Sequence, residues 1–150
     1  MRLRIVAIVA IVAIVAVAAT AVVVAVASTS AAGLPSYTNG YQKWPKLNAK
    51  PTRGTPLGRS AHNGIKNVYA SKKKIGKRYP NGTVIVKSIA QTADKPSLPS
   101  QVAVMRKVAA RWKYVEYQLS GSRYTVLAQG QLCQSCHMQA KKTDYVFTKR

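Results

Sequence analysis

The only two cysteines of the chain lie close together near its C-terminus, and a histidine follows the second one. They are Cys133 and Cys136, with His137 directly behind them in the stretch Cys-Gln-Ser-Cys-His. Two thiols at this spacing, on a turn that leads into a helix, can form thioethers with the two vinyl groups of a haem, and the adjacent imidazole can then ligate the iron. The motif therefore predicts one covalently attached haem c, with His137 as the iron ligand.

Other chemistries also use closely spaced cysteines. A thioredoxin-like redox pair lies near the start of a βαβ unit, whereas this pair follows a stretch with the character of antiparallel strands. A structural zinc site needs four ligands, and only His62 remains outside the motif. A simple disulfide between Cys133 and Cys136 stays open, because an oxidising compartment allows it, but it would not require His137.

The N-terminal part has the character of an export segment. The chain of 150 residues begins with Met-Arg-Leu-Arg, and an almost entirely apolar run occupies residues 5–27. A basic start, an apolar run and the small residues around positions 25–32 are typical of a cleaved signal peptide. The run is also long enough for an uncleaved membrane anchor. We therefore expect residues 1–32 to be a signal peptide or anchor, and residues 33–150 to form one haem domain in the periplasm.

The chain is strongly basic, with 24 Lys and Arg against three Asp and Glu and a formal net charge of +21. Such a charge attracts polyanions. The basic residues are spread along the chain, however, and no nucleic-acid-binding motif is present. The densest run, in residues 72–78, is predicted to lie in a loop. We expect an acidic redox partner protein, or an anionic membrane surface, rather than nucleic acid, with direct membrane attachment only through an uncleaved N-terminal segment.

Composition and turn signals predict a mainly β domain of the α+β class. Alternating β-branched and aromatic residues, bounded by turn residues, indicate strands at 65–69, 83–89, 112–119 and 124–127. Residues 102–108 fit either a strand or a helix. Residues 132–142 contain no Pro or Gly, which favours one short helix that carries the cysteines. We therefore expect a small antiparallel sheet with short helices, the last of them at the C-terminus.

Several blocks of the sequence resemble, in content and order, the cytochrome P-460 family, which includes the related cytochromes c'-beta. The most specific block is the C-x-x-C-H motif followed by Lys-Thr-Asp-Tyr-Val-Phe-Thr at 142–148, and the second is Asn-Gly-Thr-Val-Ile-Val-Lys at 81–87. Residues 65–69 and 112–114 also match. The resemblance extends over about residues 37–149.

The resemblance implies a β-rich haem domain that forms a homodimer and has an open distal position at its iron. Cytochromes P-460 oxidise hydroxylamine at ferric iron and carry an extra covalent bond from a lysine to the porphyrin ring. The cytochromes c'-beta lack this bond and bind nitric oxide or carbon monoxide. The lysine of the family matches Lys87, which shares a strand face with Thr83 and Ile85. The family's distal arginine matches Lys66, which keeps the charge but lacks the planar fork of donors.

One departure from the family weakens the assignment of an enzymatic activity. Members that oxidise hydroxylamine have a carboxylate two or three residues after the haem histidine, where it can act as a base. Here those positions hold Gln139 and Ala140, and neither is a base. Asp144 is the only acid nearby in the sequence, and we expect it to have a structural role.

The sequence indicates no side chain that completes the coordination of the iron. We expect Met105 to belong to the core and His62 to lie in a turn, which leaves the sixth position open. Two functions follow from the resemblance. The first is hydroxylamine oxidation, with Lys66 and Lys87 as catalytic residues. The alternative is a non-catalytic haem protein of the same fold that binds nitric oxide or transfers electrons.

Overall fold

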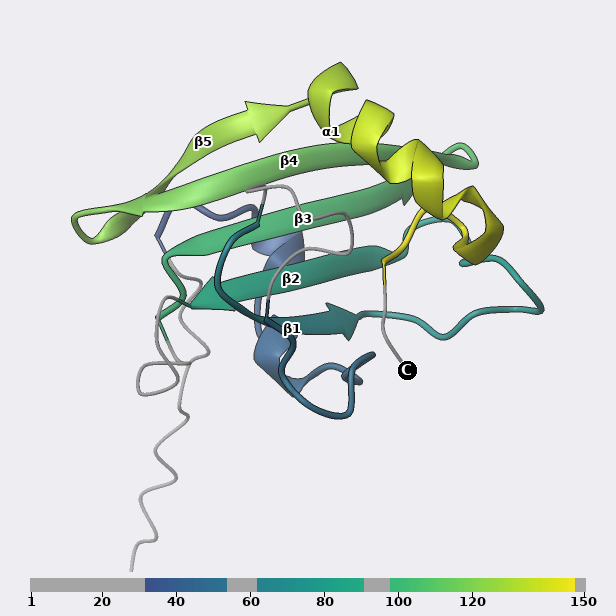
Figure 1. The fold of residues 1–150 in the computed structure, drawn as a ribbon, viewed down its shortest axis with the longest axis horizontal. Helices are drawn as coiled ribbons and strands as arrows, with labels where there is room; N and C mark the ends of the chain where they lie inside the picture. The colour runs from purple at the N-terminus through teal and green to yellow at the C-terminus, as the bar shows by residue number, and fades with distance from the viewer. Residues whose placement is uncertain (1–31, 54–61, 91–97, 148–150) are drawn as a thin grey trace, which may run out of the picture.

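A five-stranded antiparallel sheet forms the centre of the computed structural model, which describes residues 32–53, 62–90 and 98–147. The segment expected to direct export lies outside the described residues. The strands follow one another in the sheet in chain order (Figure 1). They are β1 (Ile65–Ala70), β2 (Val84–Ala90), β3 (Gln101–Val108), β4 (Arg111–Ser120) and β5 (Arg123–Gln129). In the part of the chain that the structure describes, no helix is long and apolar enough to cross a membrane.

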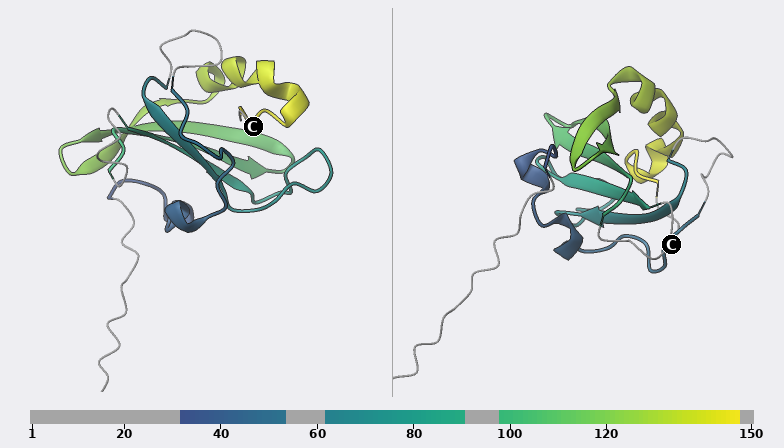
Figure 2. Two further views of the ribbon diagram at one scale, coloured as in Figure 1. Left: turned by 60° about the horizontal axis from the view of Figure 1, so that its bottom comes forward. Right: turned by 90° about the vertical axis from the view of Figure 1, so that its left-hand side faces the viewer.

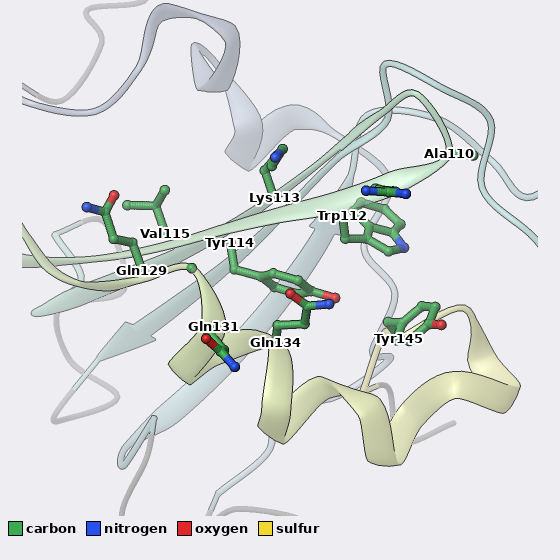
Figure 3. Close-up of a pocket in the computed structure, with 11 residues that line it drawn as sticks. Ala110, Trp112, Lys113, Tyr114, Val115, Gln129, Gln131, Gln134 and Tyr145 are labelled. Atoms are coloured by element: carbon green, nitrogen blue, oxygen red, sulfur yellow. The ribbon is translucent and has the colours of Figure 1, made fainter.

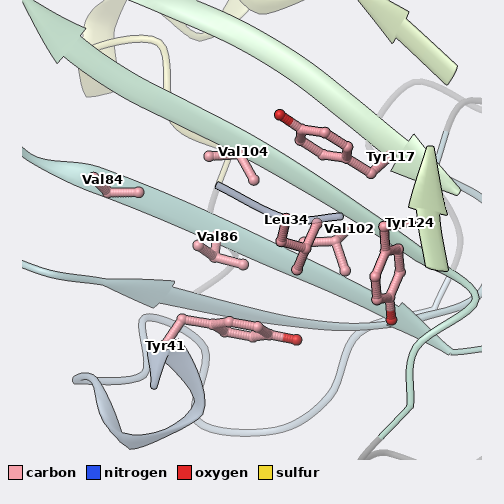
Figure 4. Close-up of a cluster of buried hydrophobic side chains, with 8 residues drawn as sticks. All are labelled: Leu34, Tyr41, Val84, Val86, Val102, Val104, Tyr117 and Tyr124. Carbon is pink, nitrogen blue, oxygen red and sulfur yellow. The ribbon is translucent and has the colours of Figure 1, made fainter. Parts of the chain in front are cut away.

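Each face of the sheet is covered by a different end of the described chain (Figure 2). Because side chains alternate along a strand, every central strand contributes to both faces. On one face, the N-terminal segment with the 3-10 helices η1 (Ser36–Thr38) and η2 (Tyr41–Lys43) packs against the sheet. Figure 4 shows the apolar cluster on this side, which consists of Leu34, Tyr41, Val84, Val86, Val102, Val104, Tyr117 and Tyr124.

The C-terminal segment covers the opposite face. It contains α1 (Gln131–His137), followed by the 3-10 helix η3 (Met138–Thr143). The second buried cluster lies beneath it and consists of Val68, Ala70, Tyr79, Ile85, Met105, Trp112, Tyr114 and Val146. The prediction that Met105 belongs to the core is therefore confirmed, and this C-terminal face is the one on which the haem motif lies.

The fold class predicted from the sequence is confirmed, with two details decided by the structure. Residues 102–108, which fit a strand or a helix, lie in β3 and pair with both β2 and β4. The expectation of one continuous helix over residues 132–142 is wrong. The α-helix ends at His137 and continues as a 3-10 helix, with non-helical angles at Ala140 (φ −98°, ψ 21°). The backbone N–H groups of Asp144 and Tyr145 close this last turn onto Lys141 and Ala140.

Asp144 has the structural role that the sequence suggested. Its buried carboxylate accepts hydrogen bonds from Lys107 Nζ at 2.7 Å, from the backbone N–H of Tyr79 at 2.7 Å and from Trp112 Nε1 at 3.5 Å. Burial alone would raise the pKa of Asp144, but these donors outweigh burial and lower it. The carboxylate thus joins the end of η3 to β3, to β4 and to the loop between β1 and β2.

Replacing Asp144 with Asn should lower the free energy of unfolding by about 3–5 kcal/mol at pH 7, because Lys107 would keep a buried charge without its partner. The pKa of Asp144 is lowered in the folded state, so its stabilisation is present above the unfolded value of 3.8 and is lost as the pH falls through the folded pKa. Urea unfolding at neutral and acidic pH measures both effects.

The double variant Asp144→Asn/Lys107→Met provides the control for this prediction, because it removes both charges. It should recover part of the lost stability. Equal stability of the wild type and Asp144→Asn at pH 7 would show that the buried pair does not hold the C-terminal segment.

Candidate functional site

Helix α1 presents Cys133, Cys136 and His137 to the C-terminal face of the sheet. Gly130, at φ 68° and ψ −130°, precedes the helix, and its backbone N–H donates to the carbonyl of Tyr114 on β4 at 3.1 Å. The start of the helix is therefore anchored to the sheet. Cys133 and Cys136 are both partly buried and are free thiols.

His137 is held in one orientation with one ring nitrogen already used. Its Nδ1 lies 2.7 Å from the backbone carbonyl oxygen of Tyr145. A carbonyl only accepts hydrogen bonds, so Nδ1 must carry the proton, which leaves Nε2 with a free lone pair. The rings of Tyr114 and Phe147 pack against the imidazole at centroid distances of 4.9 Å and 5.2 Å. This is the arrangement of a metal-ligating histidine, whose other nitrogen is fixed by a hydrogen bond.

Burial keeps the imidazole of His137 neutral. The side chain is buried, and this burial is the largest cause that lowers its pKa, to about 4. The hydrogen bond to Tyr145 and the charge of Glu116 act in the opposite direction, whereas Lys87 and His62 lower the pKa further. At neutral pH the ring is therefore in the uncharged form that binds metals.

Lys87 lies beside His137. Both residues line a small cavity whose other walls are apolar, formed by Val68, Ile85, Ala103, Met105, Val146 and Phe147. Strand β2 directs Lys87 to this face, because its cross-strand partners are Val68 on β1 and Ala103 on β3. The cavity holds only about 20 Å³, so it marks the approach of the two side chains and not the volume of a cofactor.

The amine of Lys87 is easier to deprotonate than an ordinary lysine. Burial, and secondly the charge of Lys66, lower its pKa to about 8, against weaker opposing effects of Glu116 and Cys136. A neutral amine is a nucleophile, and a desolvated lysine is the form that active sites use for covalent chemistry.

Lys66 is directed to the same face from β1. It is only 4% exposed, its Nζ donates to the carbonyl of Gly64 at 3.3 Å, and burial lowers its pKa. Its register partner is Ile89, so Lys66 and Val68 share the face that carries Lys87. The structure thus brings together the two lysines that the sequence singled out and the histidine of the haem motif.

The structure also places an acid here to which the sequence assigned no role. Glu116 is buried on β4, and its Oε1 lies 2.8 Å from Nδ1 of His62. His62 lies in a turn with φ 57°, as expected, but its ring also forms this pair. In the sequence, only the alternation along β4 indicated the position of Glu116, because it places this residue on the same face as Trp112 and Tyr114. Gln139 is exposed and Ala140 is buried, and neither side chain can act as a base.

A larger hollow of about 760 Å³ lies beside this site, between β4 and the beginning of α1 (Figure 3). Its walls include Trp112, Tyr114, Gln131, Gln134 and Tyr145. Its lining contains none of the cysteines, lysines or histidines described above. Tyr114 and Tyr145 separate it from His137, because one packs on the imidazole and the other accepts its hydrogen bond.

The donor set at this face fits a c-type haem. It consists of two free thiols on one short helix and a buried, neutral imidazole whose Nε2 is available. A family model described as Cytochrome P460 matches residues 38–148, a range that includes the haem motif and both lysines. No curated protein matches this chain.

The haem-free chain should show the cost of burying the charge of Lys87. Below a pH of about 8 the folded protein carries a buried ammonium group, whereas between about 8 and 10.5 the unfolded chain binds more protons than the folded one. The free energy of unfolding of the wild type should therefore rise across this interval. Lys87→Met should be about 1–3 kcal/mol more stable at pH 7 and should lack the rise.

Lys113→Met is the matched control for this measurement, because Lys113 is an exposed lysine on β4. Its free energy of unfolding should follow the pH dependence of the wild type in urea titrations. The same pH dependence in Lys87→Met would show that the amine of Lys87 is not desolvated.

Proposed function

The chain belongs to the cytochrome P460 family and is a haem protein, and we propose that it is exported to the periplasm, binds its haem through thioethers and oxidises hydroxylamine. One observation carries this proposal more than any other. The nucleophilic amine of Lys87 and the neutral imidazole of His137 line the same cavity, although they come from β2 and α1. A haem attached to the cysteines and His137, when bound, would supply a redox-active iron with an open position for a small ligand.

Cys133 and Cys136 attach the haem, and His137 ligates its iron in this proposal. The free thiols and the hydrogen bond from His137 Nδ1 to Tyr145 support these roles. The hydrogen bond fixes the orientation of the imidazole and raises its basicity as a ligand. Covalent attachment would retain the cofactor outside the cytoplasm, where a small protein has no supply of free haem.

Lys87 would hold the porphyrin ring through the additional covalent bond. The bond replaces one amine N–H and one ring C–H by N–C, so two hydrogens are lost and the step needs a two-electron oxidant such as a peroxide. The lowered pKa of Lys87 supports this role, because only the neutral amine attacks a ring carbon. Lys66 supplies positive charge and N–H donors for the oxygen of the bound substrate.

An acidic redox protein is the acceptor of the electrons. Exposed basic side chains gather around a second hollow of about 480 Å³ at the end of η3, namely Lys77, Arg78, Lys141 and Lys142. Lys74 connects the loop before β2 to the end of η3, because its Nζ donates a hydrogen bond to the carbonyl of Thr143 at 3.1 Å. Complementary charge of this kind steers association with an acidic partner.

We also propose that the protein forms a homodimer. Strand β5 lies at one end of the strand order, and the side chains of Val126 and Leu127 on it are 53% and 44% exposed. Such an edge favours pairing with a second copy.

The second candidate function is reversible binding of nitric oxide without turnover. It is favoured by the residues that follow the haem histidine, since Gln139 and Ala140 offer no base. In that case Lys87 stays unbonded and the haem has the absorption of an ordinary cytochrome c.

The spectrum of the reduced protein in alkaline pyridine should separate these functions. In protein expressed with haem-attachment machinery, the bond to Lys87 modifies the ring, so the wild type should give a broadened and shifted spectrum. Lys87→Arg should give an ordinary c-type spectrum and at least about tenfold slower oxidation of hydroxylamine with an artificial electron acceptor. An ordinary spectrum and no turnover in the wild type would reject the enzyme and leave the nitric oxide binder.

Reversing charge near the end of η3 should weaken docking of an acidic electron-transfer protein. Lys141→Glu/Lys142→Glu should lower the association rate about tenfold or more at low salt, and the rate of the wild type should fall with added salt. Lys43→Glu/Lys50→Glu changes the charge equally at exposed positions elsewhere and should have a smaller effect. Salt-independent association would contradict an electrostatic docking surface.

A further inference from the structure

Glu116 lies on the same face of the sheet as Lys87. It pairs in register with Ala103 on β3, and Ala103 pairs with Lys87 on β2. The three residues therefore form one row across adjacent strands on the same face. The small side chain of Ala103 lies between the two longer residues in this row, and Ala103 itself lines the cavity of Lys87 and His137.

Glu116 is one of the two acids among the described residues, and its carboxylate takes no part in the hydrogen bonds that hold the C-terminal segment. Asp144, the other acid among the described residues, is taken up by Lys107, Tyr79 and Trp112. Glu116 is only 8% exposed, and a buried carboxylate requires a partner. Its partner is the imidazole of His62, whose Nδ1 lies 2.8 Å from Oε1 of Glu116.

The turn that carries His62 is held against the sheet. Gly64 follows it at φ 129°, and a Cβ at this position would lie 2.6 Å from the carbonyl oxygen of Ala90. Only glycine allows the backbone to approach the end of β2 so closely. Lys66 adds its hydrogen bond to the carbonyl of Gly64. His62 can therefore reach Glu116 from a turn that leads into β1, three strands away in the sheet.

The titratable groups around Glu116 come from β1, β2, α1 and the turn before β1. Lys87 on β2 interacts electrostatically with Cys136 and His137 on α1, and Cys136 interacts with Cys133. The charge of Glu116 influences the pKa values of Lys87, Cys133 and His137. Lys66 on β1 acts on Lys87. With His62, these residues form one electrostatically coupled group. Glu116 is its only carboxylate among the described residues.

We propose that Glu116 is the proton acceptor of this site and that His62 is its positioning residue and outlet. This inference rests on the proposed function. In this proposal, a carboxylate on β4 takes the role of the carboxylate that the chain lacks at positions 139 and 140. For each electron that hydroxylamine gives up to a one-electron acceptor protein or dye, one proton would pass from the substrate to the carboxylate of Glu116. The imidazole of His62, whose side chain is 18% exposed, then passes that proton to water.

Glu116→Gln tests the proposal in the haem-loaded protein, because the amide keeps the shape and cannot take the proton. Its kcat for hydroxylamine should fall about 100-fold or more, which is the usual contribution of a general base. The Kd values for hydroxylamine and nitric oxide, from spectral titrations, should stay within about threefold of the wild type. Glu116→Asp should recover part of the rate.

His62→Asn tests the outlet, since its amide can keep a hydrogen bond to Glu116 but does not titrate. It should lower kcat about tenfold and leave both Kd values unchanged. This variant also decides the proposal if Glu116→Gln does not fold. Asp144→Asn, in which another buried carboxylate becomes an amide, is the control for stability and should lower the free energy of unfolding.

The outcomes separate this inference from the function on which it rests. A wild type that does not oxidise hydroxylamine overturns both. If the wild type turns over and Glu116→Gln keeps a kcat within about threefold of the wild type, Glu116 is not the proton acceptor, and the proposed enzymatic activity still stands. Where Glu116→Gln does not fold, the same result for His62→Asn leads to the same conclusion. A lower kcat together with weaker binding of both ligands would assign Glu116 to the framework of the site and also reject the proposal.

Discussion

The buried carboxylate of Asp144 holds the part of the chain on which the site depends. Asp144 and Tyr145 both have left-handed backbone angles, with φ of 58° and 65°. Residues other than glycine rarely adopt this conformation and need support from their surroundings. The hydrogen bonds of Asp144 to Lys107, Tyr79 and Trp112 supply that support. The resulting turn directs the carbonyl of Tyr145 back to Nδ1 of His137, so a framework residue determines which nitrogen of the ligand histidine is free.

The face beneath α1 carries more buried charge than stability alone would favour. Lys66 and Lys87 lie on neighbouring strands, and desolvation lowers the pKa of both side chains. The opposite face of the sheet is filled by valine, leucine and tyrosine. Such an asymmetry is typical of a sheet in which one face provides the core and the other a site. The same desolvation makes the site reactive, because it lowers the pKa of Lys87 and so increases the share of the neutral amine.

Most of the secondary structure was predictable because local patterns dominate in this chain. The alternation in β1, β2 and β4 and the turn at Asn81 and Gly82 are short-range signals. β3 was ambiguous, because its apolar run suits a buried helix as well as a central strand. The predicted C-terminal helix was too long. Its α-helical part ends at His137 because the following residues turn to bring Asp144 into the core, and no local pattern encodes that tertiary contact.

The sequence by itself determined the haem motif, since the spacing of Cys133, Cys136 and His137 is a local property of one turn of chain. It also determined the face of β2 on which Lys87 lies, because side chains alternate along any strand. Only the tertiary structure decided that Lys87 and His137 share a cavity and that His62 reaches Glu116, 54 residues away in sequence. Strand register and a close backbone approach at Gly64 set those distances, and both depend on contacts between segments that are remote along the chain.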